Sequence, residues 1–358
     1  MCTDLRANNR HEFSKTIKKE FEISPEGTTS ISNKHGKVEV FVWDRNRVKV
    51  DVTIVVRAAN ETVAQRTFDR IHINFISRPD FVGTTTEITA RKKNWWESSR
   101  DHESDYTINY QVYLPASNDL VLDHKFGDIT VAELRGNAEL QIKHSNFKFD
   151  GFGGNVQLEL AHATGALLKA QDINAEIKHS RLNIESVRFM ELDSQHSRIR
   201  VNEARDLRCN STHNTFNIGE IAVFHCNADY DDIEIERADD ITVASTYSNM
   251  IVHHIRQNLD LEMELGKVTV EEVSNGFKRI NLKGDYTDFM VNLASGTTYT
   301  MDAYADYAGI RYPKVLNVTH EKERGTRHEV KGHVGRTNVA STIFARLNYG
   351  ALRVSQKQ

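Results

Sequence analysis

Apolar and polar residues alternate in short runs along most of this chain, and between residues 173 and 252 the runs recur with a spacing of about 17 residues. Each repeat has two apolar pairs separated by a His or Tyr. The pairs that precede it are Ile173 and Ala175, Met190 and Leu192, Leu207 and Cys209, Phe224 and Cys226, and Ile241 and Val243. The pairs that follow it are Leu182 and Ile184, Ile199 and Val201, Phe216 and Ile218, Ile233 and Ile235, and Met250 and Val252. Alternation with a period of two predicts two short β-strands per repeat, with the apolar positions facing one core.

The residue between the two pairs forms a column that runs through the repeats. Its central members are His179, His196, His213, Tyr230 and Tyr247. The same frame extends with small slips to His35, Phe126, His144, His162, Leu265, Tyr286, Tyr307 and Tyr349. Small or polar residues follow the central members, namely Ser180, Ser197, Asn214, Asp231 and Ser248. They suit a corner where the inward parity switches, and we therefore expect the column itself to face the core.

A single repeat cannot bury its own apolar side, so the repeats must stack, and equivalent residues then form ladders about 4.8 Å apart. The predicted fold is all-β, a single-stranded β-helix-like solenoid with coils of about 17 residues. A helical fold does not fit alternation with a period of two that Gly, Asn and Asp interrupt so often.

The period lapses in two places. Between His35 and Phe126, long alternating runs predict an N-terminal antiparallel β layer, with a short helix in 60–71 and a charged loop at 91–105. Residues 313–341 separate Tyr307 from Tyr349 and predict a hairpin that turns at 323–326. Both insertions would cap a stack against edge-to-edge growth. The expected organisation is a lead segment, a β cap with the helix and loop, solenoid coils, and a hairpin with a closing coil, over residues 1–28, 29–121, 122–312 and 313–358.

Composition narrows the classes of partner. The chain has 46 Lys and Arg against 50 Asp and Glu, a net charge of −4, which argues against nucleic acid or an anionic membrane as the main partner. We expect no integral membrane segment, because the apolar residues are spread in short runs. The start of the sequence contains no apolar signal segment, and Cys2 would be the lipidated residue if a lipoprotein signal had been removed.

Three sets of motifs resemble a known family. The first is 31–40 followed by Trp43 and Asp44, the second is 110–115 with 126–131, and the third is 332–335 with 348–354. They are similar to repeats of the bacterial putative-adhesin family, domain of unknown function 4097, over nearly the whole chain. The resemblance implies a solenoid in the cell envelope or outside the cell, in the periplasm or at the surface, and it implies no catalytic residue. Many coils here have His-Ser or Tyr-Ser where that family more often has Gly.

The column suggests two kinds of chemistry. Stacked imidazoles from His144, His162, His179, His196 and His213 could hold a transition metal. Because Tyr takes over at Tyr230, Tyr247, Tyr286 and Tyr307, we favour a structural ladder of stacked rings and expect no metal or other cofactor. Imidazoles packed inside the coils would have pKa values below the usual value, so the expected consequence is a loss of stability in acid.

Cysteines and acids offer two further alternatives. Cys209 and Cys226 fall one coil apart in the same apolar column, where a disulfide is sterically possible and buried free thiols are favoured. Asp229, Asp231, Asp232, Asp239 and Asp240 could together bind calcium, although solvated turn positions are the simpler interpretation.

Two adjacent tryptophans are the best recognition candidate in the sequence. Trp95 and Trp96 are flanked by Lys92, Lys93 and Arg100. Exposed aromatic rings beside cations bind sugars or protein hot spots, whereas the same rings could instead fix the loop to the cap. We therefore predict a non-catalytic envelope solenoid, an adhesin-like or surface-display scaffold that binds a surface glycan or protein. The alternative is a carbohydrate-active solenoid enzyme, a polysaccharide lyase or hydrolase, which needs acids and bases that converge on one face. The oligomeric state does not follow from the sequence.

Overall fold

A computed structural model describes residues 10–90 and 105–357. Backbone contacts divide the chain into two compact units, residues 1–165 and 166–358. Both units are built almost entirely of strands, and in each of them successive coils pair in parallel, so the predicted all-β solenoid is confirmed. Among the described residues, no helix combines the length and the apolar character that crossing a membrane requires.

The first unit combines an antiparallel layer with the first coils. Its elements are β1 (His11–Glu22), β2 (Thr28–Lys34), β3 (Val38–Trp43), β4 (Arg47–Ala58), α1 (Glu61–Phe68), β5 (Ile71–Arg78), β6 (Phe81–Ile88), β7 (Asp105–Pro115), β8 (Asp119–Val131), β9 (Ala138–Phe149) and β10 (Phe152–Ala161). The strand pairs β1–β4, β4–β7 and β5–β6 are antiparallel, as expected for the N-terminal layer.

The helix α1 lies where the sequence places a short helix. Its N-cap is Asn60, whose side chain accepts a hydrogen bond from the Val63 amide at 3.0 Å and thereby satisfies one of the free N–H groups of the first turn. The helix buries Ala64, Thr67 and Phe68. It is therefore anchored by one apolar face.

The coils of the first unit begin with β2 and β3, which form one coil around His35. In this coil β2 pairs in parallel with β6, and β3 pairs in parallel with β7. Both strands also pair in parallel with β8. The strands β8 and β9, then β9 and β10, continue the parallel stack.

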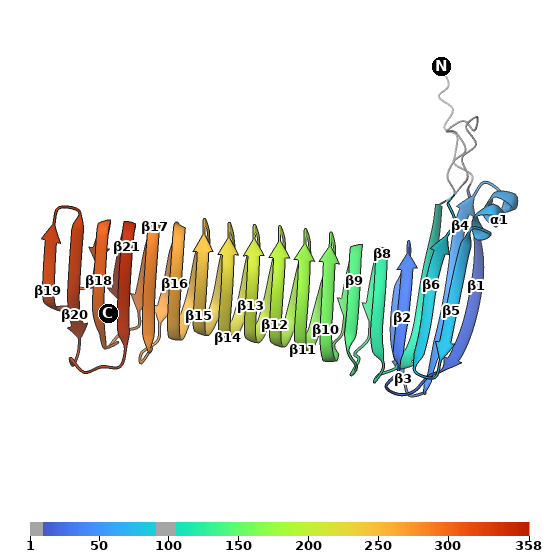
Figure 1. The fold of residues 1–358 in the computed structure, drawn as a ribbon, viewed down its shortest axis with the longest axis horizontal. Helices are drawn as coiled ribbons and strands as arrows, with labels where there is room; N and C mark the ends of the chain where they lie inside the picture. The colour runs from blue at the N-terminus through green and yellow to red at the C-terminus, as the bar shows by residue number, and fades with distance from the viewer. Residues whose placement is uncertain (1–9, 91–104, 358) are drawn as a thin grey trace, which may run out of the picture. The chain divides into compact units, whose positions relative to one another are not determined.

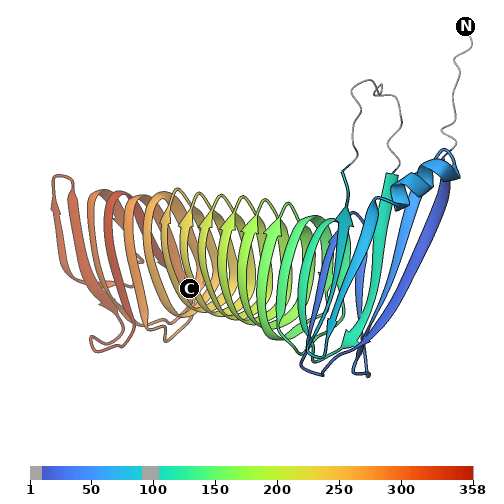
Figure 2. The same cartoon turned by 45° about the vertical axis from the view of Figure 1, so that its right-hand side comes forward.

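The second unit is a regular stack followed by a hairpin. Its elements are β11 (Thr164–Lys178, which begins at the unit boundary), β12 (Arg181–Gln195), β13 (Arg198–Thr212), β14 (Thr215–Asp229), β15 (Asp232–Thr246), β16 (Asn249–Val273), β17 (Arg279–Leu293), β18 (Tyr299–Arg311), β19 (Asn317–Arg324), β20 (Arg327–Val334) and β21 (Thr342–Gln356). Figure 1 shows β12 to β17 standing side by side, with β21 between β17 and β18, and Figure 2 shows that each coil curves back on itself as a flattened loop.

Register within the second unit follows the 17-residue spacing. Leu182 pairs with Ile199, Ile199 with Phe216, and Phe216 with Ile233. All four side chains are buried, so the predicted stacked core is confirmed. Because a neighbouring coil supplies the partners of each strand, burial and backbone hydrogen bonding are both satisfied only in the stack.

The last coil does not follow sequence order. The strand β21 pairs in parallel with β17 on one side and with β18 on the other. The hairpin of β19 and β20 has Gly325 in its turn, as expected from the sequence, and β20 pairs antiparallel with β18. The C-terminal coil is thus inserted between two strands that are consecutive in the chain.

Candidate binding surface

Every coil turns at its column residue. All thirteen column members have a positive φ, between 49° and 68°, and among the described residues they are the only residues other than glycine that do. This is the left-handed region, in which the alternation of a strand is interrupted. Each column residue therefore marks the sharp corner at which one strand half ends and the next begins.

The column side chains point outward. Tyr230 is 51% exposed and Tyr247 is 50% exposed, and His179, His196 and His213 are exposed as well. The expectation that the column faces the core is therefore wrong. The switch of parity occurs at the column residue itself and not at the residue after it. The predicted acid sensitivity of a buried histidine column loses its basis.

Neighbouring rings in the column stack face to face. In the second unit, the ring centroids of His179 and His196 are 5.0 Å apart, and those of His196 and His213 are 4.8 Å apart. The Tyr230 and Tyr247 rings follow at 4.8 Å with an interplanar angle of 2°. Since each ring face is covered by its neighbours, the column offers ring edges to a ligand rather than the open faces on which sugars stack.

At the five corners from His179 to Tyr247, the residue after the corner is buried and belongs to a polar ladder. The Ser180 amide donates to Ser197 Oγ at 3.1 Å, and the Ser197 amide donates to Asn214 Oδ1 at 2.8 Å. The Asn214 amide donates to Asp231 Oδ1 at 2.5 Å, and the Asp231 amide donates to Ser248 Oγ at 3.0 Å. From Ser180 to Asp231, the N–H of the residue after the corner is thus satisfied by a side chain of the next coil.

Asp231 is the charged member of this ladder and is only 1% exposed. Burial raises the pKa of its carboxyl group, and hydrogen bonds from Ser211 and Asn214 oppose the rise. Ser211 Oγ donates to Asp231 Oδ2 at 2.5 Å. Both carboxylate oxygens therefore have partners, which is the usual condition for a buried acid.

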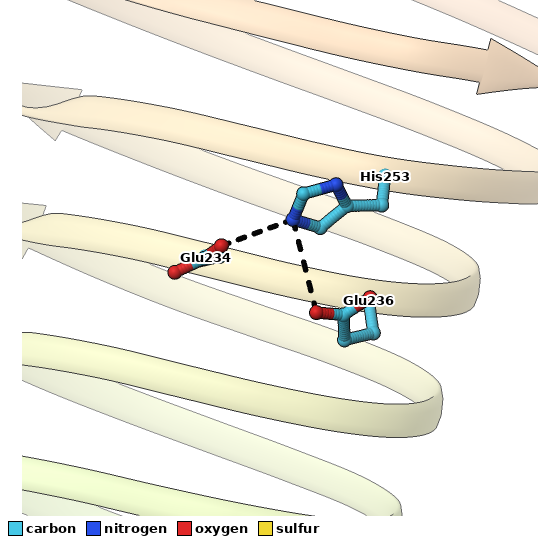
Figure 3. A group of neighbouring side chains, drawn as sticks. All are labelled: Glu234, Glu236 and His253. Atoms are coloured by element: carbon cyan, nitrogen blue, oxygen red, sulfur yellow. Dashed lines mark hydrogen bonds and ion pairs between the residues drawn. The ribbon is translucent and has the colours of Figure 1, made fainter.

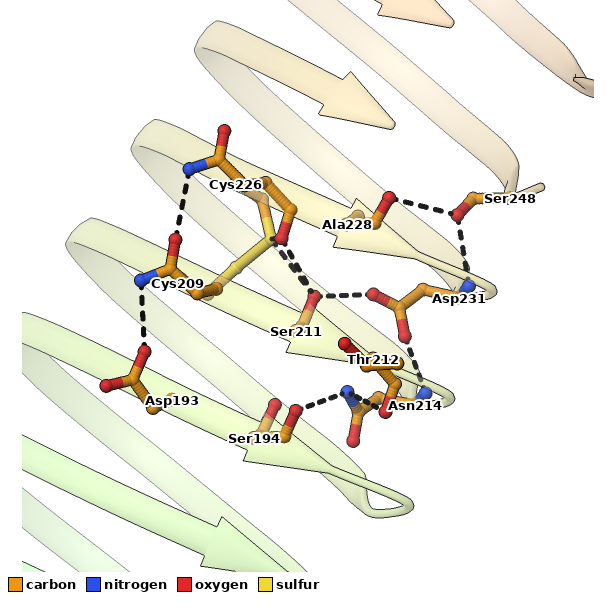
Figure 4. Close-up of a disulfide and its surroundings, with 12 residues drawn as sticks. Asp193, Ser194, Cys209, Ser211, Thr212, Asn214, Cys226, Ala228, Asp231 and Ser248 are labelled. Atoms are coloured by element: carbon orange, nitrogen blue, oxygen red, sulfur yellow. Dashed lines mark hydrogen bonds between the residues drawn. A yellow bond between two sulfur atoms is a disulfide. The ribbon is translucent and has the colours of Figure 1, made fainter. Parts of the chain in front are cut away.

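A disulfide lies beside this ladder. Cys209 and Cys226, on adjacent coils, are bonded with a Cα–Cα distance of 4.6 Å, so the preference for free thiols is wrong (Figure 4). Ser211 Oγ lies 3.4 Å from Cys226 Sγ and links the disulfide to Asp231. Both cysteines are buried, and the bond staples two coils from inside.

One hollow of the second unit lies on the outer face of the strands that lead into the corners. It has a volume of about 740 Å³ and is lined by outward side chains in two rows, with one residue from each of five coils in each row. In the order of the coils, the first row is Ala244, Glu262, Lys283, Arg346 and Tyr304. The second row is Thr246, Glu264, Asp285, Asn348 and Asp306. We call this hollow the polar groove.

Charges in the polar groove are partly paired with each other. Lys283 Nζ lies 3.2 Å from Glu262 Oε2, and Asn348 donates to Asp285 at 3.2 Å. Asp306 accepts a hydrogen bond from Thr326 of the hairpin at 2.7 Å. Tyr304 adds one partly exposed aromatic ring. The groove therefore offers hydrogen-bond donors and acceptors at regular intervals along the stack.

A cluster of His and Glu side chains lies on the strand halves that follow the corners. His253 Nε2 is 3.0 Å from Glu234 Oε1 and 3.8 Å from Glu236 Oε1 (Figure 3). His253 Nδ1 is 3.0 Å from Glu271 Oε2. Hydrogen bonds to Glu234 and Glu271 raise the pKa of His253, and partial burial opposes them. Three or more His, Cys, Asp or Glu residues could hold a metal ion where their metal-binding atoms lie within 4.8 Å of one another. Among residues 10–90 and 105–357, the only such group is Glu234, Glu236 and His253.

The five Asp residues considered for calcium binding do not gather their carboxyl groups at one point among the described residues. Asp231 is buried at the corner, Asp239 pairs with Arg256, and Asp240 accepts from Asn258 at 2.6 Å. Asp232 accepts a hydrogen bond from Asn249 at 3.2 Å. The acids are thus used separately, and the interpretation as solvated turns fails for Asp231.

Trp95, Trp96, Lys92, Lys93 and Arg100 lie outside the described residues, and so does Cys2. Their predicted roles stay predictions. Sequence reasoning missed the polar groove and the His253 cluster. A signal for the cluster was present, because Glu236, His253 and Glu271 each follow a column residue by the same six positions. The groove had no such signal, because it depends on where β21 is inserted.

Comparison with known proteins gives no family assignment. No family model and no curated protein matches the chain, so the resemblance to domain of unknown function 4097 is not confirmed. Six chains among the solved structures do match. TM-scores of the size found for these matches do not establish a common fold.

Three of these structures illustrate the likeness. A putative cell adhesion protein from Clostridium sporogenes is 8% identical, with 96% of this chain and 100% of that chain covered and a TM-score of 0.19. A putative lipid binding protein from Parabacteroides distasonis is 11% identical, with coverages of 96% and 97% and a TM-score of 0.28. A putative adhesin from Parabacteroides merdae is 10% identical, with coverages of 78% and 92% and a TM-score of 0.29.

Proposed function

We propose that this chain is a non-catalytic, adhesin-like solenoid of the cell envelope that displays the polar groove as a binding site for a surface glycan or protein. The observation that carries the proposal is the composition of the groove, in which five coils each contribute two outward side chains. A groove built by repetition along one axis suits a long ligand with repeated polar groups. Hydroxyl-rich glycans have that character.

The chemistry of the groove supports binding over catalysis. A glycoside hydrolase needs a pair of carboxyl groups, one of them protonated, on opposite sides of the scissile bond. In the groove, Glu262 is paired with Lys283, Asp285 accepts from Asn348, and Asp306 accepts from Thr326. These contacts engage three acids of the groove with neighbouring side chains, which supports the scaffold over the alternative of a polysaccharide lyase or hydrolase.

The disulfide supports a location outside the cytoplasm. Stable disulfides form in oxidising compartments, such as the periplasm or the cell surface, and are rare in the cytosol. The Cys209–Cys226 bond joins two adjacent coils of the core. It is therefore consistent with a protein of the cell envelope or of the extracellular space.

Glycan-array binding by the purified chain tests the proposal. We expect saturable binding that Tyr304→Ala and Arg346→Ala weaken at least tenfold, because both side chains lie in the first row of the groove. Arg208→Ala is the matched control, since Arg208 is an exposed arginine outside the groove that pairs with Asp206 much as Arg346 pairs with Asp302.

Two results would contradict the proposal. Release of reducing ends or unsaturated sugars from a bound polysaccharide would favour the enzyme. Retention of full binding by both groove variants would remove the groove from the function.

A further inference from the structure

We propose that Glu234, Glu236 and His253 form a binding site for a divalent transition-metal ion such as Zn²⁺, on the outer face of two adjacent coils. Two carboxylate oxygens and one imidazole nitrogen face a common point (Figure 3). Mixed oxygen and nitrogen donors of this kind suit zinc and its neighbours in the first transition series.

The repeat places the three ligands together. Glu234 and Glu236 are two residues apart on β15, so both side chains leave the same face of the strand. The register pairs Ile235 with Val252, and this brings His253 of β16 level with Glu236 on that face. The ligands therefore lie on regular strands, which position side chains more precisely than loops do.

The second imidazole nitrogen is oriented for coordination. Glu271, one coil further on, holds His253 Nδ1 at 3.0 Å. With the Nδ1 proton directed to Glu271, Nε2 faces Glu234 and Glu236 at 3.0 Å and 3.8 Å, and a bound metal ion would take the place of the proton that joins Nε2 to Glu234. A carboxylate that fixes the far nitrogen of a ligand histidine is the usual arrangement around protein-bound zinc.

The charge balance gives independent support. Three carboxylates surround one imidazole, and among the described residues Glu234, Glu236 and Glu271 have no ion pair with Lys or Arg. Neighbouring acids on these coils and on the preceding coil are paired with Lys or Arg. Glu220 has Arg237 and Arg256, Asp239 has Arg256, and Glu272 has Lys357. The cluster thus lacks positive charge in a region where other acids are neutralised, and a divalent cation would supply it.

The exposure of the three ligands indicates a surface site with a coordination position open to water. The side chains of Glu234 and Glu236 are 47% and 62% exposed, and that of His253 is 28% exposed. Three protein ligands leave at least one position of a tetrahedral ion open to water. Because the ligands come from two coils, bound metal would also tie β15 to β16 from the outside.

Isothermal titration of the chelator-treated full chain with ZnCl₂ tests the inference. We expect one saturable site, and Co²⁺ in its place should give the visible absorption of a low-symmetry complex. His253→Gln should weaken zinc binding at least a hundredfold, and Glu271→Gln should weaken it about 10–100-fold by removing the orienting carboxylate. His225→Gln is the matched control, because His225 is an exposed histidine of the neighbouring strand β14 outside the cluster.

The outcomes separate the cluster from the histidine column. His196→Gln removes a column imidazole and should leave zinc affinity unchanged. The inference is overturned if the unaltered chain shows no saturable site. It is also overturned if His253→Gln binds zinc like the unaltered chain, or if His225→Gln or His196→Gln weakens binding as much. Circular dichroism of each variant, matched to that of the unaltered chain, confirms that the coils are intact.

Discussion

Lowering the pH tests whether His124 is a buried, neutral side chain in the core of the first unit. Its side chain lies inside the coil of β8 and is 0% exposed. Burial lowers its pKa from 6.5 to about 4, with smaller opposing effects from Asp128 and the backbone of Asn33 and Gly36. The equivalent residue of the next coil is Ile142, so His124→Ile introduces the side chain that the repeat itself uses at this position.

The expected effect follows from proton linkage. A histidine whose folded pKa is depressed binds fewer protons in the folded chain than in the unfolded chain, so stability is complete above pH 6.5 and is lost as the pH falls toward the folded pKa. The full difference of about 2.5 pH units corresponds to about 3.4 kcal/mol. Integration between the two pKa values gives a loss of about 2 kcal/mol by about pH 5.

Urea unfolding followed by tryptophan fluorescence measures this loss of stability in the first unit. All three tryptophans of the chain lie within residues 1–165, and Trp43, whose indole N–H donates to the Arg47 carbonyl, reports on the folding of that unit. We expect the free energy of unfolding to fall by about 2 kcal/mol more in the unaltered chain than in His124→Ile between about pH 7.5 and about pH 5. His35, whose pKa is also lowered, is present in both chains and cancels in the difference. Parallel pH profiles for the two chains would refute the assignment of His124 as a buried, neutral imidazole.

Three further changes test the coils of the second unit. Ile233→Asp should destabilise the chain by at least about 3 kcal/mol, because an unpaired carboxylate enters the core, whereas Ile251→Asp, at a position that is 42% exposed, should cost less than about 1 kcal/mol in urea unfolding followed by far-ultraviolet circular dichroism. Replacing Cys226 by Ala should lower the free energy of unfolding by about 3 kcal/mol, as expected for a loop of this length, and an Ellman titration that finds both core thiols free in the unaltered chain would contradict the disulfide. His196→Ala should be less stable than His196→Gly by about 1 kcal/mol, the reverse of the usual order in strands, because residue 196 has a φ of 50°; equal stability of the two variants would show that the corner is not strained.

The sequence was sufficient to predict the coils and their corners. The 17-residue spacing from His162 to Tyr247, extended with slips in both directions, identifies the thirteen column residues, all of which have a positive φ. The corner itself lies at the column residue and not at the residue after it, where the sequence placed it. The direction of the column was not predictable from alternation alone. A left-handed residue breaks the rule that successive side chains point to opposite faces, so His196 points outward while Ser194 and Ser197 on either side are buried.

The candidate sites were harder to predict than the coils. Periodicity defines which residues form a coil, and it does not define the place of that coil in the stack. Arg346 and Asn348 of β21 enter the polar groove only because β21 pairs with both β17 and β18. In the His253 cluster, Glu236, His253 and Glu271 come from three successive coils and lie at the same distance in sequence from the column residue. This pattern is found only when the outward positions of the coils are compared as well as the inward ones.

The insertion of β21 also governs the order in which the second unit can be completed. A parallel solenoid lends itself to growth coil by coil as the chain leaves the ribosome, because each new coil finds the edge of the preceding one. Here β17 cannot pair with β21 as soon as it is made. Arg279 of β17 pairs with Thr342 of β21, and β18 and the hairpin are synthesised between these two strands. Until β21 has been synthesised, β17 presents an unpaired edge, the kind of surface on which chains join one another. Nascent chains that end before residue 342 would therefore carry this open edge, and the addition of β21 covers it.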